Sequence, residues 1–396
     1  MIILVINSGS SSLKFQLLNM DDESVMAQGQ VEKIGLHEGI FTIKAGGLKN
    51  KKEMEIPDHQ VAMELVLNGL LETKEAGLNS LDEIDAIGHR IVQGGDTFSK
   101  AVLVDDAEHD KIEEYGAMAP LHNPAHLKGI DACSKVMPGK PQVVVFDTAF
   151  HQTMSPVAYT YGLPKEYAEK HRIRRYGAHG TSHKYVSRRV AELMGKPVED
   201  LKIITCHLGN GSSISAIKNG KVVDTSMGFT PHEGLLMGTR CGDIDATAVL
   251  YLMKHEGFDS DRMDHMLNKE SGLLGVSGVS SDFRELDEAI AQGNQNAKLA
   301  RDIFIYRVKK YIGSYVAAMN GVDVICFTAG IGENAPLVRS LVCEHLGFLG
   351  VSIDEEANHK RGEEIAISTP DSKTTVMVIP TNEELAIARE TVSLVK

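Results

Sequence analysis

Two stretches of this chain, separated by about half its length, repeat one uncommon pattern. "MIILVINSGSSSLKFQLLN" opens the chain, and "LKIITCHLGNGSSISAIKNG" begins at Leu201. In each stretch an apolar strand enters a Gly/Ser turn and leaves as a second strand. A helical stretch and a buried strand, "QVVVFDT" or "VDVICFTAG", follow in both halves. The pattern predicts an α/β protein with two similar domains whose hairpins point into a shared cleft, while chance similarity of two turns is the alternative.

Length, charge and cysteine usage limit the class of protein. The 396 residues suit two or three domains, and we expect one over residues 1–150 and one over 151–382, with a C-terminal helix at about 383–396 packing back on the first. The net charge of −13 disfavours nucleic acid or an anionic membrane as a partner. Five scattered cysteines without a CxxC pair, and an N-terminus without a basic segment, indicate a cytoplasmic protein.

The two Gly/Ser turns are candidate phosphate sites. Lys14 follows the first turn with a mobile positive charge, but the stretch lacks the glycine and hydroxyl that flank the lysine of a P-loop. In the second turn, Gly209 and Gly211 leave backbone amides able to converge on an anion. A plain hairpin turn between two strands is the alternative for the first stretch.

A third glycine-rich turn, "AGIGENA", follows the strand "VICFT". Gly330, Gly332 and Ala335, with Asp354 downstream, weakly resemble a dinucleotide-binding fingerprint. That fingerprint normally opens a domain, whereas this turn comes last in its domain. A nucleotide that is shared among three turns is the preferred interpretation.

Arginines and histidines cluster in glycine-rich loops of this acidic chain. Guanidinium groups match carboxylate and phosphoryl oxygens in pairs, so the clusters favour an anion site, although each arginine alone also fits a surface ion pair. The HxxxH spacings of His122 with His126 and of His179 with His183 could suggest zinc, but neither pair has an acidic third ligand nearby, which disfavours it. The arginines and histidines that form these candidate anion-site clusters are His89 and Arg90, Arg174, Arg175, His179 and His183, and Arg240.

Two acidic residues stand at the ends of expected elements. Asp147 ends the strand "QVVVFDT", and Glu383 lies in "IPTNEELAIA" before the last helix. Thr381 and Glu384 are spaced as a capping box, which leaves Glu383 to face a cation. If a nucleotide binds, Mg²⁺ is the expected cation for these carboxylates.

Eight separated motifs resemble, in the same order, the acetate kinase family over essentially the whole chain. They are "NSGSSSLK", "HRIVQGG", "FDTAFH", "RRYGAHGTSH", "HLGNGSS", "GTRCGD", "AGIGEN" and "TNEE". The resemblance implies duplicated actin-like (ribonuclease H-like) domains facing each other across a nucleotide cleft, and a homodimer. It also implies reversible transfer of the γ-phosphoryl group of ATP to acetate, giving acetyl phosphate and ADP.

Residue roles follow from the resemblance, motif by motif. It implies Mg²⁺, or Mn²⁺, at Asn7 and Glu383. It implies acetate binding by Arg90, Val92, Leu121 and Pro231, and catalysis by Arg90, Asp147, His179 and Arg240. It implies nucleotide binding by Lys14, His207, Leu208, Gly209, Asn210, Gly211, Asp282, Phe283, Arg284, Gly330, Ile331, Gly332, Glu333 and Asn334.

Two points depart from the family pattern or its usual interpretation. The family assigns Asp147 as acid/base, but acetate is already ionised at neutral pH, so we hypothesise that Asp147 orients Arg90 or Mg²⁺-bound water. Ala178 stands where the family usually has phenylalanine in the acetate pocket. The smaller side chain predicts a larger pocket and a shift towards propionate or other short carboxylates, unless a neighbouring side chain fills the space. Two alternatives to a carboxylate kinase are a non-kinase ATPase and a sugar or polyol kinase with Asp147 as base.

Overall fold

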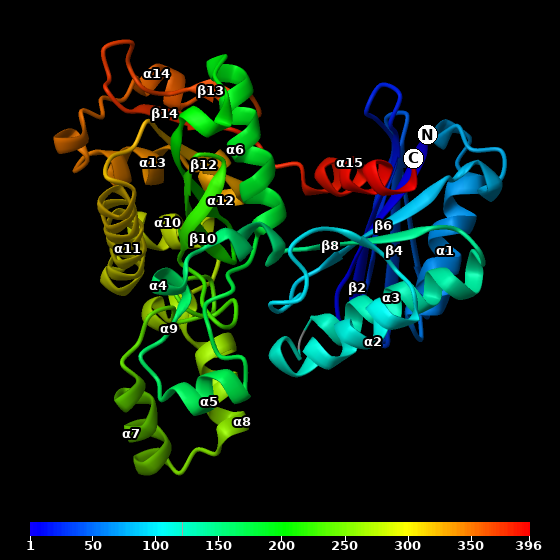
Figure 1. The fold of residues 1–396 in the computed structure, drawn as a ribbon, viewed down its shortest axis with the longest axis horizontal. Coiled ribbons are helices and arrows are strands. Elements are labelled where there is room, and N and C mark those ends of the chain that lie inside the picture. Colours follow the sequence, from blue (N-terminus) through cyan, green and yellow to red (C-terminus); the bar gives the residue numbers. More distant parts are fainter. Residues whose placement is uncertain (121) are drawn as a thin grey trace. The chain divides into compact units, whose positions relative to one another are not determined.

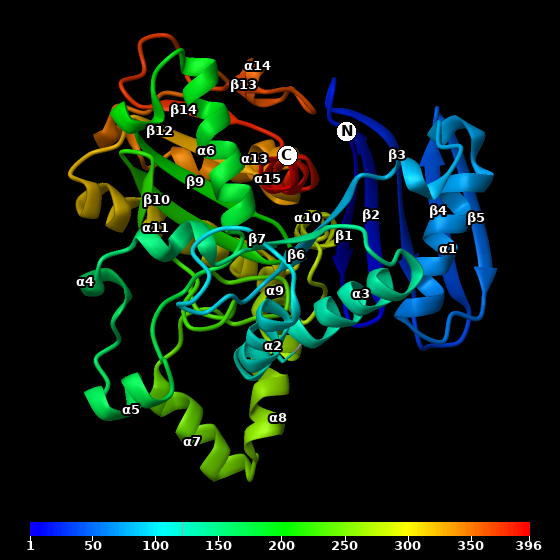
Figure 2. The same cartoon turned by 45° about the vertical axis from the view of Figure 1, so that its right-hand side comes forward.

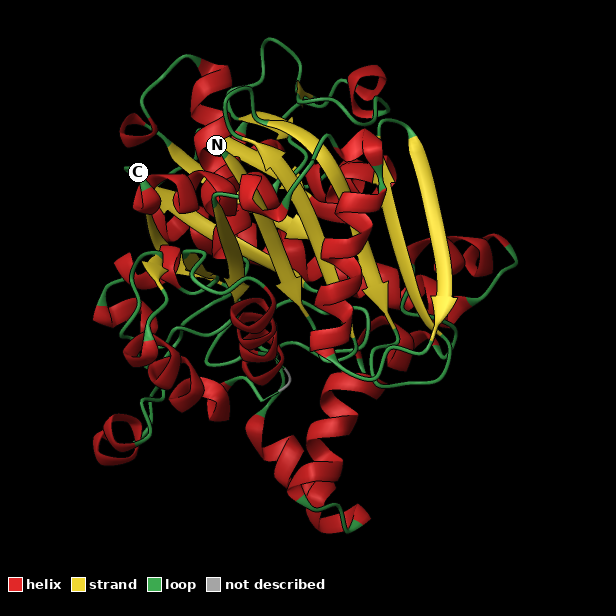
Figure 3. Cartoon of the chain, turned by 90° about the vertical axis from the view of Figure 1, so that its right-hand side faces the viewer, coloured by secondary structure: helices red, strands yellow, loops and turns green. Residues whose placement is uncertain are grey.

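The computed structural model describes residues 1–120 and 122–396, so Leu121, expected in the acetate pocket, lies outside the described residues. The chain divides into two compact units. Unit 1 comprises Met1–Phe150 and Asn382–Lys396, and unit 2 comprises His151–Thr381. Each unit has its own sheet and its own apolar core, and both helices and strands are present in the chain (Figure 3).

Unit 1 is a mixed sheet with helices on both faces. Its strands are β1 (Ile2–Ser8), β2 (Ser12–Asn19), β3 (Ser24–Glu32), β4 (Gly39–Ala45), β5 (Leu48–Met54), β6 (Ala86–Ile91), β7 (Val102–Leu103) and β8 (Gln142–Phe146), in the order β5-β4-β3-β2-β1-β6-β8-β7. Its helices are α1 (His59–Glu72), α2 (Asp106–Glu114), α3 (Asn123–Val136) and α15 (Glu383–Val395).

The two faces of the unit 1 sheet are covered by different segments of the chain. Ile87 packs in the core with residues of α1 and α3, whereas an added Cβ at its neighbour Gly88 would lie 2.6 Å from Thr391 Oγ1 of α15. Because successive residues of a strand face opposite sides, α15 covers the face opposite α1 and α3. Only a glycine at this position allows α15, the red helix in Figure 1, to lie so close to β6.

Unit 2 contains a smaller sheet and more helices. Its strands are β9 (Lys202–Leu208), β10 (Ser212–Lys218), β11 (Lys221–Thr225), β12 (Val324–Thr328), β13 (Ile365–Ala366) and β14 (Thr375–Val378), in the order β11-β10-β9-β12-β14-β13. Its helices are α4 (Pro156–Tyr159), α5 (Lys165–Lys170), α6 (Gly180–Met194), α7 (Ala246–Glu256), α8 (Ser260–His265), α9 (Gly272–Ser277), α10 (Phe283–Ala291), α11 (Gln295–Met319), α12 (Ala329–Asn334), α13 (Pro336–Cys343) and α14 (Glu355–Asn358).

The strand order confirms the predicted duplication. In both sheets the first strand pairs antiparallel with the next strand of the chain and parallel with a later strand, which pairs parallel with another. These strands are β1, β2, β6 and β8 in unit 1, and β9, β10, β12 and β14 in unit 2. The equivalence of single strands differs from the one drawn from the sequence. "QVVVFDT" forms β8, whose counterpart is β14, whereas "VICFT" forms β12, the counterpart of β6.

Unit 2 also presents two unlike sheet faces. Ile204, Cys206 and Leu208 of β9 join the apolar core with α11, while Thr205 and His207 face α6. Helices α7 and α8 extend away from the sheet of this unit (Figure 2). Across the described residues, no helix combines the length and apolar character required to span a membrane.

Candidate active site

The carboxyl ends of β1 and β6 bring three predicted site residues of unit 1 to one face. Val5 of β1 pairs with Gly88 of β6, so two residues further on Asn7 and Arg90 share the face that α15 covers. Glu383 is the first residue of α15, and the electrostatic influence of Arg90 and Lys14 acts on its carboxylate. The strand register therefore places Asn7 and Arg90 on the face that α15, which begins at Glu383, also covers.

Arg90 and Asp147 form a two-pronged ion pair. Arg90 Nε donates to Asp147 Oδ1 at 3.0 Å, and Nη2 donates to Oδ2 at 2.6 Å, with the Asp147 side chain fully buried. Burial alone would lower the pKa of Arg90, but the carboxylates of Asp147 and Glu383 outweigh it and raise that pKa. The Asp147 amide also donates to Ile91 O at 2.8 Å, which fixes the carboxylate to the end of β6. This geometry positions the guanidinium, as the hypothesis about Asp147 requires.

Glu383 has the features of a cation ligand. Its Oε1 is buried and makes no hydrogen bond, and burial raises its pKa to about 7 against the opposing effect of Arg90. A buried carboxylate oxygen without a partner is destabilising, and a hard cation with oxygen ligands would satisfy it. Together with the amide oxygen of Asn7 on the same face, Glu383 fits Mg²⁺.

The start of α15 differs from the predicted capping box. Asn382 caps the helix, accepting from Leu385 N at 3.0 Å. Thr381 belongs to unit 2, where its hydroxyl lies 2.8 Å from Ser182 Oγ and its amide donates to Glu333 Oε1 at 3.1 Å. The capping-box interpretation of Thr381 and Glu384 is therefore wrong, because the more local Asn382 side chain satisfies the helix amide.

The first hairpin places Lys14 directly across from Asn7 in the strand register, with its side chain exposed. The turn is closed by Gly9 N, which donates to Ser12 O at 2.7 Å. His59 of α1 donates from Nε2 to Gly9 O at 2.8 Å and so ties the turn to the helix. The hairpin is thus a fixed support for one exposed ammonium group.

The loop after β6 carries Val92, which is buried. The Asn123 side chain binds both backbone polar groups of Gln93, which follows Val92. Gln93 N donates to Asn123 Oδ1 at 3.1 Å, and Asn123 Nδ2 donates to Gln93 O at 2.8 Å. His89 is also buried, bonded to Gln142 Oε1 at 2.7 Å, and burial lowers its pKa to about 4. Of the predicted anion-site pair, only Arg90 is available for a charged role, because His89 is neutral.

One buried group of unit 1 was missed as a site candidate. Both ring nitrogens of His126, on the α3 face, are buried without a hydrogen bond, as is Ser8 Oγ at the end of β1. Burial, reinforced by Arg90, holds the pKa of His126 well below its usual value. The sequence offered His126 only as one half of an HxxxH pair, which carries no information on its burial.

In unit 2, His179 begins α6 in a strained backbone conformation. Its φ of 59° lies in the left-handed region, which costs a non-glycine residue free energy. Its ring stacks on His207 with centroids 4.1 Å apart, and its Nδ1 lies 2.9 Å from Ser213 Oγ. Strain of this kind is typical of residues held for function.

The second Gly/Ser turn lies against His179 and Arg240. A Cβ added to Gly211 would be 3.6 Å from His179 Cε1 and 3.6 Å from Arg240 Nη1. Arg240 Nη1 donates to Pro231 O at 2.7 Å, a neutral acceptor, and burial lowers the pKa of this guanidinium. An imidazole, a guanidinium and a glycine backbone that meet in this way suit a phosphoryl group.

A cavity of about 740 Å³ in unit 2 joins the predicted nucleoside residues. This volume is in the range of small-molecule sites. Phe283 lies in its wall and packs edge-on against Phe304, with ring centroids 4.9 Å apart. The predicted residues that line the cavity are Gly209, Asn210, Asp282, Phe283, Arg284, Gly330, Ile331 and Asn334. Arg361 also lines it, and sequence reasoning did not find it.

Three predicted nucleotide residues lie behind that wall. The Glu333 carboxylate accepts from Ala329 N at 2.7 Å, and Gly332 O accepts from Arg339 Nη1 at 2.8 Å. Leu208 is fully buried in the apolar core. These side chains and carbonyls support the turn and the start of α12, and their predicted ligand contacts stay predictions.

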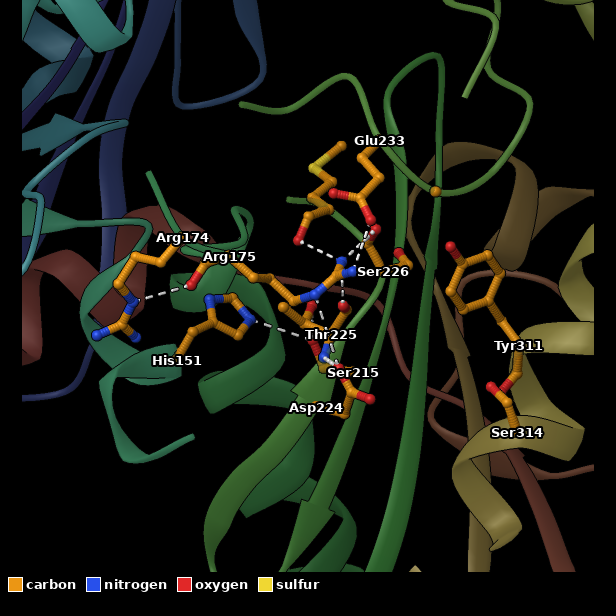
Figure 4. Close-up of polar contacts among 12 residues, drawn as sticks. His151, Arg174, Arg175, Ser215, Asp224, Thr225, Ser226, Glu233, Tyr311 and Ser314 are labelled. Atoms are coloured by element: carbon orange, nitrogen blue, oxygen red, sulfur yellow. Dashed lines mark hydrogen bonds and ion pairs between the residues drawn. The ribbon is translucent and has the colours of Figure 1, made fainter. Parts of the chain in front are cut away.

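The two arginines of "RRYGAHGTSH" differ in how fully neighbouring groups hold them. Arg175 Nη1 donates to the carbonyls of Thr225, Ser226 and Met227 at 3.0 to 3.2 Å, and Nη2 pairs with Glu233 (Figure 4). Tyr161 OH donates to the same Glu233 carboxylate.

Arg174 lies 3.5 Å above the Tyr159 ring, and its Nε donates to Arg175 O at 3.2 Å. Protein groups engage the Arg175 guanidinium, which does not support an anion site there. Arg174 Nη2 is buried without a hydrogen bond, so the anion site expected at Arg174 stays a prediction.

Ala178 is buried in a small apolar cluster with Met227 and Met237. Methionine is flexible and fills irregular gaps. The space left by the missing aromatic ring therefore has two candidate occupants within unit 2, which weakens the expectation of an enlarged pocket.

Comparison with known proteins agrees with these features. The model of the acetokinase family matches residues 2–389. An acetate kinase of Dictyoglomus thermophilum is 58% identical over 99% of this chain and 99% of its own length. The crystal structure of a Porphyromonas gingivalis acetate kinase superimposes with a TM-score of 0.96 at 49% identity, covering 100% of both chains. A propionate kinase from Francisella tularensis superimposes with a TM-score of 0.93 at 44% identity, covering 99% of both.

Proposed function

The chain belongs to the acetokinase family, and from this premise we propose that it is an acetate kinase that transfers the γ-phosphoryl group of ATP reversibly to acetate. The observation that carries the proposal is the fork of Arg90 on the buried Asp147, which fixes the guanidinium that we propose to bind a carboxylate substrate. The nucleotide is proposed to occupy the cavity of unit 2 lined by Phe283 and Gly330.

Arg90 binds the carboxylate of acetate. A carboxylate oxygen then forms a bond to the γ-phosphorus while the bond from phosphorus to the bridging oxygen of ADP breaks, so that the electron pair leaves with ADP. Acetate is ionised at neutral pH and gives up no proton, so the step needs no general base. Asp147 therefore acts by holding Arg90, and this role separates the enzyme from a sugar kinase, in which a hydroxyl must be deprotonated.

His179 and Arg240 stabilise the phosphoryl group during transfer. The transition state spreads negative charge over the three equatorial oxygens, and fixed donors oppose that charge without reorganising. The amides of the turn at Gly209 and Gly211, and the ammonium of Lys14, hold the remaining phosphates. Asn7 and Glu383 would hold Mg²⁺, which neutralises phosphate charge when bound.

The assay that tests the proposal incubates the protein with MgATP and acetate, propionate or glycerol, and measures ADP and acyl phosphate. We expect acetyl phosphate with acetate, and loss of about 100-fold in kcat/KM for acetate in Arg90→Lys, which cannot form the fork. Formation of ADP with glycerol alone would indicate a sugar or polyol kinase. ADP without any acceptor would indicate an ATPase.

Acetate is the preferred acceptor in this proposal in spite of Ala178. Met227 and Met237 form a buried apolar cluster with Ala178 and are candidates to fill the space of a ring. We expect Ala178→Phe to change the ratio of kcat/KM for acetate and propionate by less than about tenfold, which is below the effect of one methylene in a hydrophobic pocket. A larger change would mean that Ala178 determines which size of carboxylate the enzyme prefers as acceptor.

Two further proposals concern the protein in the cell. We infer a cytoplasmic location, supported by five free thiols, four of them buried. We also infer a homodimer, supported by the apolar surface of α7, whose residues are all at least partly exposed.

A further inference from the structure

A single hydroxyl joins two histidines behind the phosphoryl site of unit 2. Ser213 Oγ of β10 lies 2.9 Å from His179 Nδ1 and 2.8 Å from His183 Nε2. A serine hydroxyl carries one proton, so it donates to one ring and accepts from the other. The states of the two rings are therefore coupled through Ser213.

The second histidine is held in a neutral state. His183 is fully buried, and burial keeps its pKa well below the usual value, with His151 and His207 adding to the effect. Its Nδ1 lies 2.6 Å from Thr205 Oγ1. A neutral imidazole has one N–H, so His183 donates from one nitrogen and accepts at the other. Both ring nitrogens of His183 make hydrogen bonds, so neither can ligate a metal ion.

Only two directions of this chain of hydrogen bonds are consistent. In one, Thr205 donates to His183, His183 donates to Ser213, and Ser213 donates to His179 Nδ1. A neutral His179 then carries its proton on Nε2. In the reverse direction the proton of neutral His179 is on Nδ1, and Nε2 would turn a lone pair towards an anion.

We propose that Thr205, His183 and Ser213 form a relay of positioning residues that fixes His179 as a neutral donor, with its proton on Nε2 directed to a phosphoryl oxygen. The inference rests on the proposed function, because an anionic oxygen selects the first direction. It extends that function because His179 can donate a hydrogen bond from Nε2 without carrying a net charge. His179 can therefore act as a donor above the pH at which imidazolium is lost.

The surroundings of His179 in unit 2 bear on its charge. Among the described residues of unit 2, the titratable or charged groups that face it include His207 of β9, stacked on its ring, His183 of α6, and Arg240 beside Gly211. These groups are unchanged in a variant of Ser213, and the relay supplies a donor at Nε2 when the His179 ring is neutral.

The first test is Ser213→Ala, with kcat measured from pH 6 to 8.5. At about pH 6 imidazolium donates in any case, whereas at about pH 8.5 we expect kcat about tenfold below the parent protein, the size typical of lost positioning partners. Dividing kcat of the variant by kcat of the parent protein at each pH removes the contributions of other titrating groups. We expect KM for ATP to be unchanged and Ser213→Thr, which keeps the hydroxyl, to restore the profile.

Ser215→Ala is the matched control. Ser215 is a buried serine of the same strand and bonds His151 and Thr225 (Figure 4), so the same truncation is made outside the relay. A ratio for Ser213→Ala that stays near one at every pH, or that equals the Ser215→Ala ratio, would overturn the proposal.

A second measurement does not depend on catalysis or on a variant. Nitrogen-15 NMR of histidine-labelled parent protein at pH 8, with Mg²⁺ and a non-hydrolysable ATP analogue, reports which ring nitrogens carry protons. We expect His179 protonated at Nε2 and not at Nδ1, and a proton on Nδ1 would refute the relay. If the parent protein makes no acetyl phosphate, the proposed function fails while this spectrum still decides the state of His179.

Discussion

At the scale of single residues, Asp147 offers the sharpest contrast between positioning and proton transfer. Asp147→Asn keeps the shape but replaces one of the two acceptors of Arg90 by a donor. We expect kcat/KM for acetate to fall about 100-fold or more, because a buried guanidinium loses its paired charge, and we expect no recovery at high pH. Steady-state kinetics across pH test this. Rescue by high pH or by added small bases would instead assign Asp147 a base role.

A second residue-scale prediction concerns acid stability. His89 has a folded-state pKa of about 4, below its ordinary 6.5, so the unfolded chain takes up a proton that the folded chain refuses. The contribution of His89 to the free energy of unfolding is therefore fully present above pH 6.5. About 3 kcal/mol of it is lost as the pH falls towards 4. His89→Gln should flatten the fall in free energy of unfolding, measured with urea.

The control for this experiment is the histidine of α2 that lies nearer the surface, His109, which pairs with Asp131. His109 is not buried, so His109→Gln should not reproduce the flattening expected for His89→Gln. An equal flattening in both variants would show that burial of His89 is not the cause.

At the scale of elements, a buried arginine holds α12, the short helix beside the unit 2 cavity. Arg339 of α13 is fully buried and donates to Gly332 O, Glu333 O and both oxygens of Asn358, all neutral acceptors. Burial lowers its pKa to about 10. Arg339→Met would leave these oxygens without donors, and we expect a loss of about 3 kcal/mol or more in the free energy of unfolding.

Arg361→Met is the matched control, because this arginine is exposed in the wall of the same cavity. Urea unfolding should leave its stability within about 0.5 kcal/mol of the parent. Equal destabilisation of the two variants would contradict the role given to Arg339.

The elements also show what sequence could predict. Strands β8 and β12 are apolar on both faces, and α11 has apolar residues at helical spacing, so pattern alone finds them. β5, "LKNKKEM", is exposed along its whole length at the edge of its sheet, and its lysines give no apolar signal. The Arg339 contacts with Asn358 depend on the tertiary fold, which local composition does not encode.

At the scale of the whole molecule, duplication was visible because two Gly/Ser turns follow two apolar strands in one order. The same reasoning, joined to the family resemblance, placed Gly209, Asp282 and Gly330 in one site, and the cavity of unit 2 brings them together. The relay behind His179 was invisible, because Thr205 and Ser213 read as ordinary strand residues. Their function depends on α6 covering that face of the sheet.

The remaining prediction concerns association of two copies through α7. Leu250 and Tyr251 of this helix are 63% and 62% exposed, and Ile244 just before it is 44% exposed. Clustered large apolar side chains on one helix mark an interaction surface. We expect the protein to be a dimer by light scattering and Leu250→Glu with Tyr251→Glu to be a monomer, because buried charges would face the partner.

Phe348→Glu provides the comparison, since Phe348 is 74% exposed and lies outside α7. It should remain a dimer, because a single exposed apolar side chain is ordinary on a protein surface. A monomeric parent protein, or a dimer that survives the double substitution in α7, would move the association to another surface. Dissociation in both variants would mean that general loss of apolar surface, and not this helix, weakens the dimer.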